Sequence, residues 1–215
     1  MDTFSMDIVV LISGNGSNLQ ALIDQQPDHH YRIVAVISNK PDAYGLQRAQ
    51  QANIPTKVID HQQFTDRNAF DQALQNNIDN FQPELVVLAG FMRILTDNFV
   101  RHYTGRMINI HPSLLPKYRG LHTHQRVIDA GDTEHGTTVH FVTEELDGGP
   151  IIIQAVISVT KEDTATTLAQ KVQQQEHIIY PKAVAWFSER KLKMEHNKCL
   201  LDGELLPPQG VQIRH

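Results

Sequence analysis

Short apolar runs alternate with helical patterns through the first half of the chain, and this alternation restricts the fold to a small set. Runs of Val, Ile and Leu that are nearly continuous are typical of strands buried on both faces, as in parallel sheets. We predict strands over 7–13, 31–38, 56–59 and 84–89, and helices over 17–25, about 43–53 and 67–80. The pattern therefore predicts a Rossmann-like α/β fold, in which a mostly parallel sheet is flanked by helices.

The second half of the chain has a mixed pattern. We predict strands over 107–110, about 137–142 and about 150–156, helices over about 122–130 and 164–187, and a short β-like tail around 192–194 and 200–201. No repeat, low-complexity segment or linker separates the two halves. We therefore expect one α/β domain over 1–215, with an N-terminal half of about 7–105, a mixed C-terminal half of about 106–190 and a short tail.

Composition excludes several classes of partner. The formal net charge is −5, so no basic surface indicates binding to nucleic acid or to an anionic membrane. No apolar run approaches the ~20 residues that span a bilayer, and the N-terminus lacks a signal-peptide pattern. The single cysteine, Cys199, excludes an internal disulfide framework and fits a reducing compartment. We expect a cytoplasmic protein with no nucleic-acid or membrane partner.

The stretch Asn-Ile-His-Pro-Ser-Leu-Leu-Pro at 109–116 places two polar groups where a strand should end. Asn109 and His111 are two apart on an extended chain and would project from the same side, and Pro112 prevents a central strand from continuing. An amide donor beside an imidazole suits a reaction in which charge develops on a carbonyl oxygen. Asp147 follows on a Gly-rich turn. Taken singly, each of these features is explained by capping or by ordinary turn chemistry. Taken together, Asn109, His111 and Asp147 favour an acyl-transfer centre.

A Gly-rich loop follows the first predicted strand. Gly14 and Gly16 allow a tight turn, and Ser17 and Asn18 add donors at a helix N-terminus, where amides attract anions. The third glycine of the dinucleotide fingerprint is replaced by Leu19, and no acidic residue ends the second strand. This favours a phosphomonoester over NAD. The alternative is a structural turn in which Ser17 or Asn18 only caps the helix.

We expect no metal site. The histidines form no cluster with the spacing of a zinc motif, and the closest pair, His122 and His124, is interpreted as a feature of the loop.

Four motifs read in order carry a resemblance to a known family. They are Gly-Asn-Gly-Ser-Asn at 14–18, Phe-Met-Arg-Ile-Leu at 91–95, the Asn-x-His-Pro run at 109–116 and Leu-Asp-Gly-Gly-Pro at 146–150. With these motifs the chain resembles the folate-dependent phosphoribosylglycinamide formyltransferases of purine biosynthesis. The resemblance extends from Ile8 to about Gly210. The Asn-x-His-Pro run at 109–116 belongs to the wider group of formyl-tetrahydrofolate transferases and hydrolases, and the Gly-Asn-Gly-Ser-Asn motif at 14–18 narrows the resemblance to this family.

The resemblance implies a formyltransferase fold and a role for each matching residue. The co-substrate would be 10-formyltetrahydrofolate, with glycinamide ribonucleotide as the acceptor. The N-terminal half would bind phosphate and the C-terminal half would hold the folate and catalytic residues. The implied catalytic residues are Asn109, His111 and Asp147. The implied ribonucleotide contacts are Gly16, Ser17, Asn18, Gln173 and Glu176, and the implied folate contacts are Arg67, Met92, Arg93, Ile94, Leu95, Asn109, His140, Val142 and Asp147.

Two alternatives and one departure stay open. A hydrolase of the same group would use the same trio with water as the nucleophile, although such enzymes carry an additional regulatory domain, which we do not expect here. A non-catalytic nucleotide-binding module would leave the trio unexplained. The departure is Arg119, where relatives can carry Pro. The sequence leaves open whether the protein forms a homodimer.

Overall fold

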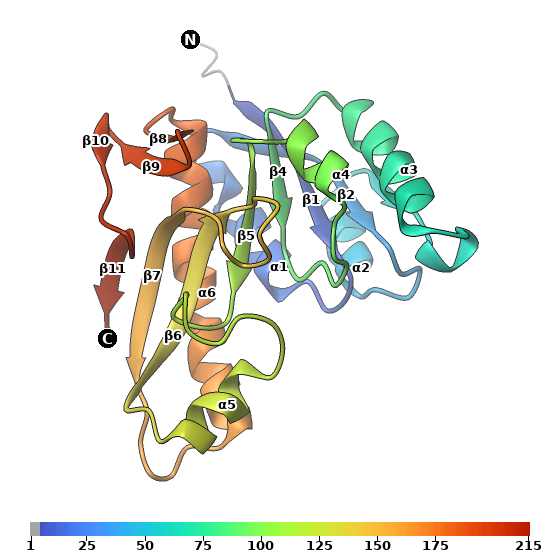
Figure 1. The fold of residues 1–215 in the computed structure, drawn as a ribbon. Coiled ribbons are helices and arrows are strands. Elements are labelled where there is room, and N and C mark those ends of the chain that lie inside the picture. The colour runs from blue at the N-terminus through green and yellow to red at the C-terminus, as the bar shows by residue number, and fades with distance from the viewer. Residues whose placement is uncertain (1–4) are drawn as a thin grey trace. The chain divides into compact units, whose positions relative to one another are not determined.

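The computed structural model describes residues 5–215, and the chain forms two compact units. The first extends to Ile108 and the second begins at Asn109. The division lies within strand β5 (Met107–His111), close to the boundary expected between the two halves. The fold is α/β, with mostly parallel strands flanked by helices and antiparallel strands toward the C-terminus (Figure 1). That the two units form a single domain stays a prediction.

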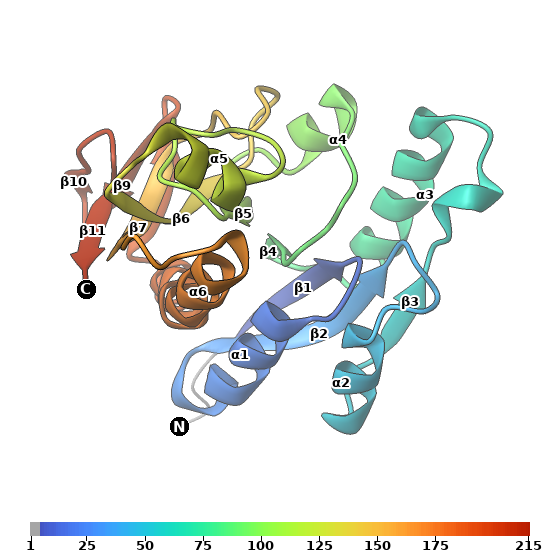
Figure 2. The same ribbon diagram turned by 90° about the horizontal axis from the view of Figure 1, so that it is seen from below.

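The first unit contains four parallel strands in the order β4-β1-β2-β3. Figure 2 shows α1 and α2 on one face of these strands and α3 on the other. The strands are β1 (Met6–Ile12), β2 (Tyr31–Ser38), β3 (Thr56–Val58) and β4 (Leu85–Leu88). The helices are α1 (Ser17–Gln25), α2 (Gly45–Gln51), α3 (Arg67–Asp79) and α4 (Asp97–His102), with short 3₁₀ helices η1 (Gln26–Asp28) and η2 (His61–Gln63).

The apolar pattern explains why β1 lies at the centre of this unit. Its residues from Ile8 to Ile12 are fully buried, and burial of each such side chain contributes ~1.5–3 kcal/mol. Polar side chains set where the helices begin. Asp66 accepts a hydrogen bond from the Ala69 amide at 2.8 Å, and Thr96 accepts one from the Phe99 amide at 3.3 Å. These caps satisfy backbone donors that have no partner within a helix.

The second unit is mixed, with strands in the order β11-β7-β6-β5. Strands β6 (Glu134–Phe141) and β7 (Ile151–Ser158) are antiparallel, while β11 (Val211–Arg214) pairs with β7 in parallel. The β6–β7 register shifts by one residue after Val139, which pairs with Ile153, so that His140 pairs with Ile151. Ile152 is therefore a bulge on β7.

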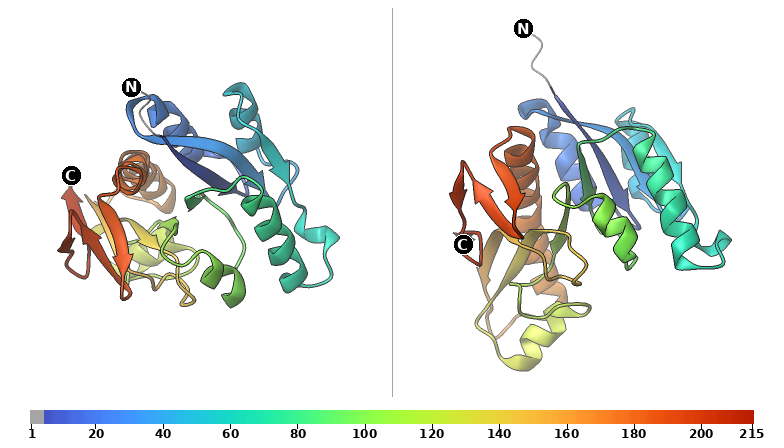
Figure 3. Two further views of the ribbon diagram at one scale, coloured as in Figure 1. Left: turned by 90° about the horizontal axis from the view of Figure 1, so that it is seen from above. Right: turned by 45° about the horizontal axis from the view of Figure 1, so that its top comes forward.

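Two helices and a small sheet complete the second unit. Helix α6 (Ala165–Ser188) packs against β6 and β7, and α5 (Thr123–Ala130) packs against α6. A three-stranded antiparallel sheet follows, coloured orange to red in Figure 3. It consists of β8 (Leu192–Glu195), β9 (Lys198–Leu201) and β10 (Glu204–Leu205).

The predicted elements form, with some differences in their bounds. Helix α1 and strand β2 have the predicted residues. Strand β6 begins at Glu134 rather than about 137, because its first residues pair with the end of β7. The prediction missed α4, β10, β11 and the two 3₁₀ helices, all of which are short.

Candidate functional site

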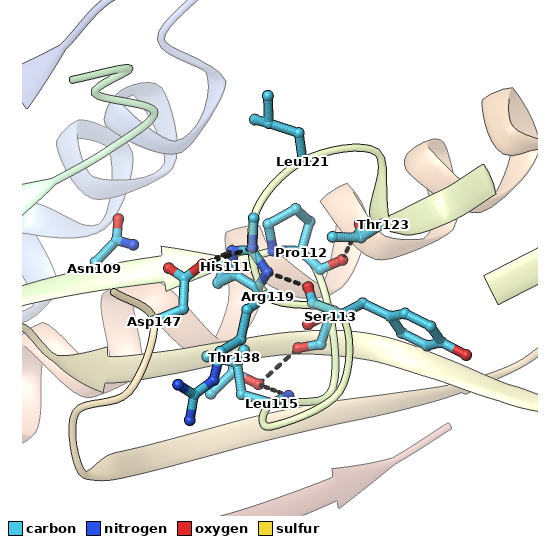
Figure 4. A network of polar contacts seen from close by, with 12 residues as sticks. Asn109, His111, Pro112, Ser113, Leu115, Arg119, Leu121, Thr123, Thr138 and Asp147 are labelled. Atoms are coloured by element: carbon cyan, nitrogen blue, oxygen red, sulfur yellow. Dashed lines mark hydrogen bonds and ion pairs between the residues drawn. The ribbon is translucent and has the colours of Figure 1, made fainter. Parts of the chain in front are cut away.

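The second unit brings together the histidine and the carboxylate of the predicted trio. His111 is the last residue of β5, and Asp147 lies in the turn between β6 and β7. His111 Nδ1 lies 3.6 Å from Asp147 Oδ2, and the two side chains are only 8% and 9% exposed. Figure 4 shows the carboxylate pointing toward the imidazole, with Asn109 two residues back on the same strand. This is an ion-pair distance, which brings a carboxylate to a group able to carry a proton.

The other ring nitrogen of His111 is engaged by the backbone. Nε2 lies 2.8 Å from the carbonyl oxygen of Tyr118. A carbonyl only accepts hydrogen bonds, so Nε2 carries a hydrogen and donates it. Nδ1, on the side of Asp147, is therefore the nitrogen that can gain or lose a proton while this contact is kept.

Asn109 is oriented by a neutral histidine. His140 Nδ1 lies 2.9 Å from the Phe141 carbonyl oxygen and must donate to it. Burial lowers the pKa of His140, which favours the neutral ring. Its Nε2 is then an acceptor, 3.4 Å from Asn109 Nδ2. This fixes which end of the Asn109 side chain is the amide donor and leaves its second N–H for another acceptor.

The turn that carries Asp147 is held from both sides. Asp147 Oδ2 accepts a hydrogen bond from the Gly120 amide at 2.9 Å, and Gly148 N donates to the Glu145 carbonyl oxygen at 3.0 Å. A side chain at Gly149 would place its Cβ 1.8 Å from the Phe141 carbonyl oxygen, so only glycine fits there. Arg119 forms an ion pair with Glu145 across the same two segments, but both side chains are exposed, and such pairs contribute little.

The Gly-rich loop of the first unit leads into helix α1, and the N-cap residue of this helix has no side chain to cap it. Gly16 is the N-cap residue of α1 and has a φ of 77°, in the left-handed region. A Cβ on Gly16 would lie 2.7 Å from the Gly45 Cα atom, so the close approach also requires glycine. Arg48 steadies the loop by donating to the Asn15 carbonyl at 2.8 Å and to its side-chain oxygen at 2.7 Å. Gly16, rather than Ser17 or Asn18, is thus the N-cap residue of α1, and a purely structural role of the loop stays an alternative.

The segment 91–96 of the first unit is irregular, and a buried serine anchors it. Ser13 Oγ accepts a hydrogen bond from Met92 N at 2.8 Å and donates to Asn39 Oδ1 at 2.5 Å. The side chains of Met92 and Ile94 are exposed, at 62% and 56%. This segment thus presents apolar side chains at the surface of the first unit.

The remaining predicted contacts lie on different elements. Arg93 packs its guanidinium over the Phe70 ring at 5.1 Å, and Leu95 is half-buried. Arg67 is exposed at the start of α3, and Val142 is half-buried after β6. Gln173 and Glu176 are three residues apart on α6, which places them on one face of that helix. Within its own unit, the structure thus gathers Asn109, His111, His140 and Asp147, and the roles of all these residues stay predictions.

Several residues that shape these sites had no sequence signal. Tyr118 acts through its carbonyl, and Ser13, Arg48 and Thr138 act through contacts to the backbone of distant segments. Over the described residues 5–215, no group of three His, Cys, Asp or Glu side chains is arranged to hold a metal ion. Within the same range, no helix has the length and apolar character needed to cross a membrane.

Comparison with known proteins gives concordant matches. A family model described as formyl transferase matches residues 6–184. The phosphoribosylglycinamide formyltransferase of Escherichia coli (strain K12) is 56% identical over 207 residues, covering 95% of the chain and 98% of that protein. The Haemophilus influenzae protein of the same name is 48% identical over 205 residues, covering 94% and 97%. The structure of the Coxiella burnetii phosphoribosylglycinamide formyltransferase is 55% identical with a TM-score of 0.94, covering 97% of the chain and 99% of that structure.

Proposed function

Because the chain belongs to the formyl transferase family, we propose that it transfers the formyl group of 10-formyltetrahydrofolate to the amine of glycinamide ribonucleotide. The product is N-formylglycinamide ribonucleotide, an intermediate of de novo purine biosynthesis. The observation that carries the proposal is the buried pair of His111 and Asp147, 3.6 Å apart. A formyl transfer between two nitrogens needs one group that donates a proton and one that accepts it, and this pair supplies both.

The bond changes assign a task to each residue. The amine nitrogen bonds to the formyl carbon, and the bond from that carbon to N10 of the folate breaks. In between, negative charge develops on the formyl oxygen, toward which Asn109 directs the amide N–H that His140 leaves unused. A donor of this kind contributes ~10²–10³ in rate. The arrangement thus supports Asn109 as the residue that stabilises the oxyanion.

The proton balance assigns His111 and Asp147. The attacking amine must lose a proton and N10 must gain one. His111 as imidazolium donates from Nδ1 to the departing N10, since Nε2 is occupied by Tyr118. Asp147 accepts the proton lost by the amine, directly or through water, and its charge stabilises the imidazolium. General acid catalysis of this kind contributes ~10²–10⁴.

The Gly-rich loop supports the choice of nucleophile. Its half-buried residues Gly16, Ser17 and Asn18 lie at a helix N-terminus, where backbone amides favour an anion such as the phosphate of the ribonucleotide. Ser17 and Asn18 add side-chain contacts there, with Gln173 and Glu176 at the other end of the ribonucleotide. The folate binds through Arg67, the 92–95 segment, His140 and Val142. We further propose that the protein acts in the cytoplasm and that it forms a homodimer.

The experiment distinguishes transfer from hydrolysis. The protein is incubated with 10-formyltetrahydrofolate alone and then with glycinamide ribonucleotide added. We expect little formate in the first case and the N-formyl product in the second, because a positioned amine gains ~7–11 kcal/mol over a freely diffusing nucleophile. Rapid formate release that the ribonucleotide neither suppresses nor diverts would mean that the protein is a hydrolase.

A variant tests the binding of the ribonucleotide separately. Gly16→Val forces a side chain against Gly45. We expect weaker ribonucleotide binding with folate binding unchanged, as measured by calorimetry with each ligand. Equal loss of both would show that the loop has only a structural role.

A further inference from the structure

The tautomer of His111 depends on one backbone carbonyl. The Tyr118 oxygen lies 2.8 Å from Nε2 and takes the hydrogen on that nitrogen. If this oxygen moved away, the neutral ring could carry its hydrogen on either nitrogen. With the hydrogen on Nδ1, the ring could no longer accept a proton on the side of Asp147. The position of the Tyr118 backbone therefore decides which nitrogen is available for proton transfer.

The Tyr118 backbone adopts a conformation that needs support. Its φ is 53°, in the left-handed region, which residues with bulky side chains seldom adopt. Such a residue persists only where the surrounding structure holds it in place. The side chain supplies this hold, because its hydroxyl donates a hydrogen bond to Asp132 Oδ2 at 2.6 Å. That bond also raises the pKa of Tyr118, so the hydroxyl stays protonated.

Further contacts lock the same residue. The ring packs against a buried apolar cluster of the second unit and lies under the Arg126 guanidinium at 5.1 Å. Arg126 also donates to the carbonyl oxygens of Arg119 at 2.6 Å and Leu121 at 3.2 Å, which follow Tyr118 in the chain. The cluster comprises Val127, Ile157, Leu168 and Val172. The loop after His111 is thus fixed at Tyr118 through its hydroxyl, its ring and its neighbours.

We propose that Tyr118, anchored by Asp132, is a positioning residue that holds the hydrogen of His111 on Nε2 and keeps Nδ1 available for the reaction. The proposal rests on the proposed formyl transfer, since it concerns how His111 serves that step. Tyr118 itself exchanges no proton. Its side chain acts at a distance, through its own carbonyl, on the nitrogen at the far side of the ring from Asp147.

The experiment uses the full chain labelled with ¹⁵N at histidine. The ring nitrogen signals of His111 report directly whether Nδ1 or Nε2 carries the hydrogen, independently of activity. They are followed over a pH titration, because Asp147, His124, His135 and His140 all interact electrostatically with His111. The variants are Tyr118→Phe, which removes only the hydroxyl, and Asp132→Ala, which removes its acceptor. Asp132→Asn keeps an acceptor oxygen and serves as the conservative rescue.

The first unit offers a matched control. Tyr103 makes the same kind of bond, with its hydroxyl 2.7 Å from Asp79 Oδ1, and Arg106 lies over its ring at 4.7 Å. Tyr103→Phe therefore removes an equivalent bond that has no connection to His111. It separates a general loss of stability from the positioning effect.

We expect Tyr118→Phe and Asp132→Ala to raise the Nδ1–H fraction of His111 and to lower kcat ~10- to 100-fold, the effect of losing one hydrogen bond to a charged group. The KM values should change less than about threefold, Asp132→Asn should recover part of kcat, and Tyr103→Phe should leave the His111 signals unchanged. Unchanged His111 signals in both Tyr118→Phe and Asp132→Ala would overturn the positioning role, even with normal transfer by the unaltered protein. Absence of transfer by the unaltered protein would instead refute the proposed function.

Discussion

Thr138 connects the loop after His111 to the centre of the second unit, and its removal should be costly. Thr138 Oγ1 donates to the Ser113 carbonyl at 2.7 Å and accepts from the Leu115 amide at 3.1 Å (Figure 4). It also accepts a hydrogen bond from Gln154 Nε2 at 3.0 Å. Thr138, Ser113 and Leu115 are at most 2% exposed, so water cannot replace these bonds. Thr138→Val keeps the shape of the side chain and removes only the hydroxyl.

The loss of unfolding free energy follows from the backbone groups that lose the Thr138 hydroxyl as their hydrogen-bond partner. The Ser113 carbonyl and the Leu115 amide each lose it, and a buried polar group without a partner costs ~1–3 kcal/mol. Thr138→Val should therefore lower the free energy of unfolding by about 2–6 kcal/mol. The adjacent Thr137 is an internal control. Its Oγ1 donates to the His111 carbonyl at 3.0 Å, but that carbonyl keeps the Ser113 amide at 2.9 Å. Thr137→Val should cost only ~0.5–1.5 kcal/mol.

Urea denaturation followed by circular dichroism measures both variants. A shift in midpoint with an unchanged slope reports stability rather than a change in the unfolded state. Thr138→Ser should stay close to the unaltered protein, because it retains the hydroxyl and loses one methyl group, worth ~0.8 kcal/mol. Equal destabilisation by Thr137→Val and Thr138→Val would refute the reasoning, since it would show that the number of orphaned backbone groups does not determine the cost.

Three further predictions address activity, pH dependence and the Asp147 turn. Asn109→Ala should lower kcat ~10²–10³-fold with little change in KM, because its donor acts on charge that develops only during the reaction; steady-state kinetics showing less than a fivefold loss would contradict this role. Burial lowers the pKa of His135 from 6.5 to about 4, so the unfolded state binds more protons between these values and stability should fall as the pH is lowered through this window. The urea midpoint, plotted against pH from 4 to 7, should rise less steeply in His135→Gln than in the unaltered protein. An equally steep rise would assign the pH dependence to other groups. Gly149→Ala should lower both stability and kcat, because its Cβ would lie 1.8 Å from the Phe141 carbonyl oxygen; a normal urea midpoint would show that the turn adjusts.

Local pattern was sufficient to predict the long elements. The helix over Ser17–Gln25 and the strand over Tyr31–Ser38 were predicted with their observed bounds, because the glycines before one and the apolar run of the other are local signals. Helix α4 has only six residues and β11 only four, which gives too few apolar positions to establish a period. The pairing of β11 with β7 joins segments far apart in the sequence, and no local pattern carries that information.

In the candidate site, the sequence likewise indicated some residues and not others. Asn109, His111 and Asp147 could be proposed from the sequence because their side chains carry the chemistry. Tyr118 could not, because its contribution comes from a backbone carbonyl that every residue possesses. The orientation of Asn109 likewise depends on the tautomer of His140, which is set by burial and by the Phe141 carbonyl.

The bulge at Ile152 has a consequence for how insertions and deletions act near the site. Val139 pairs with Ile153 and His140 with Ile151, so removal of Ile152 would leave both pairs opposite each other and the length of the Asp147 turn unchanged. It would, however, remove the extra bend and twist that a bulge gives its strand. The orientation of the Asp147 carboxylate therefore depends partly on the number of residues in β7 and not only on their identity. A one-residue deletion in β7 can reorient the turn with every functional side chain still present.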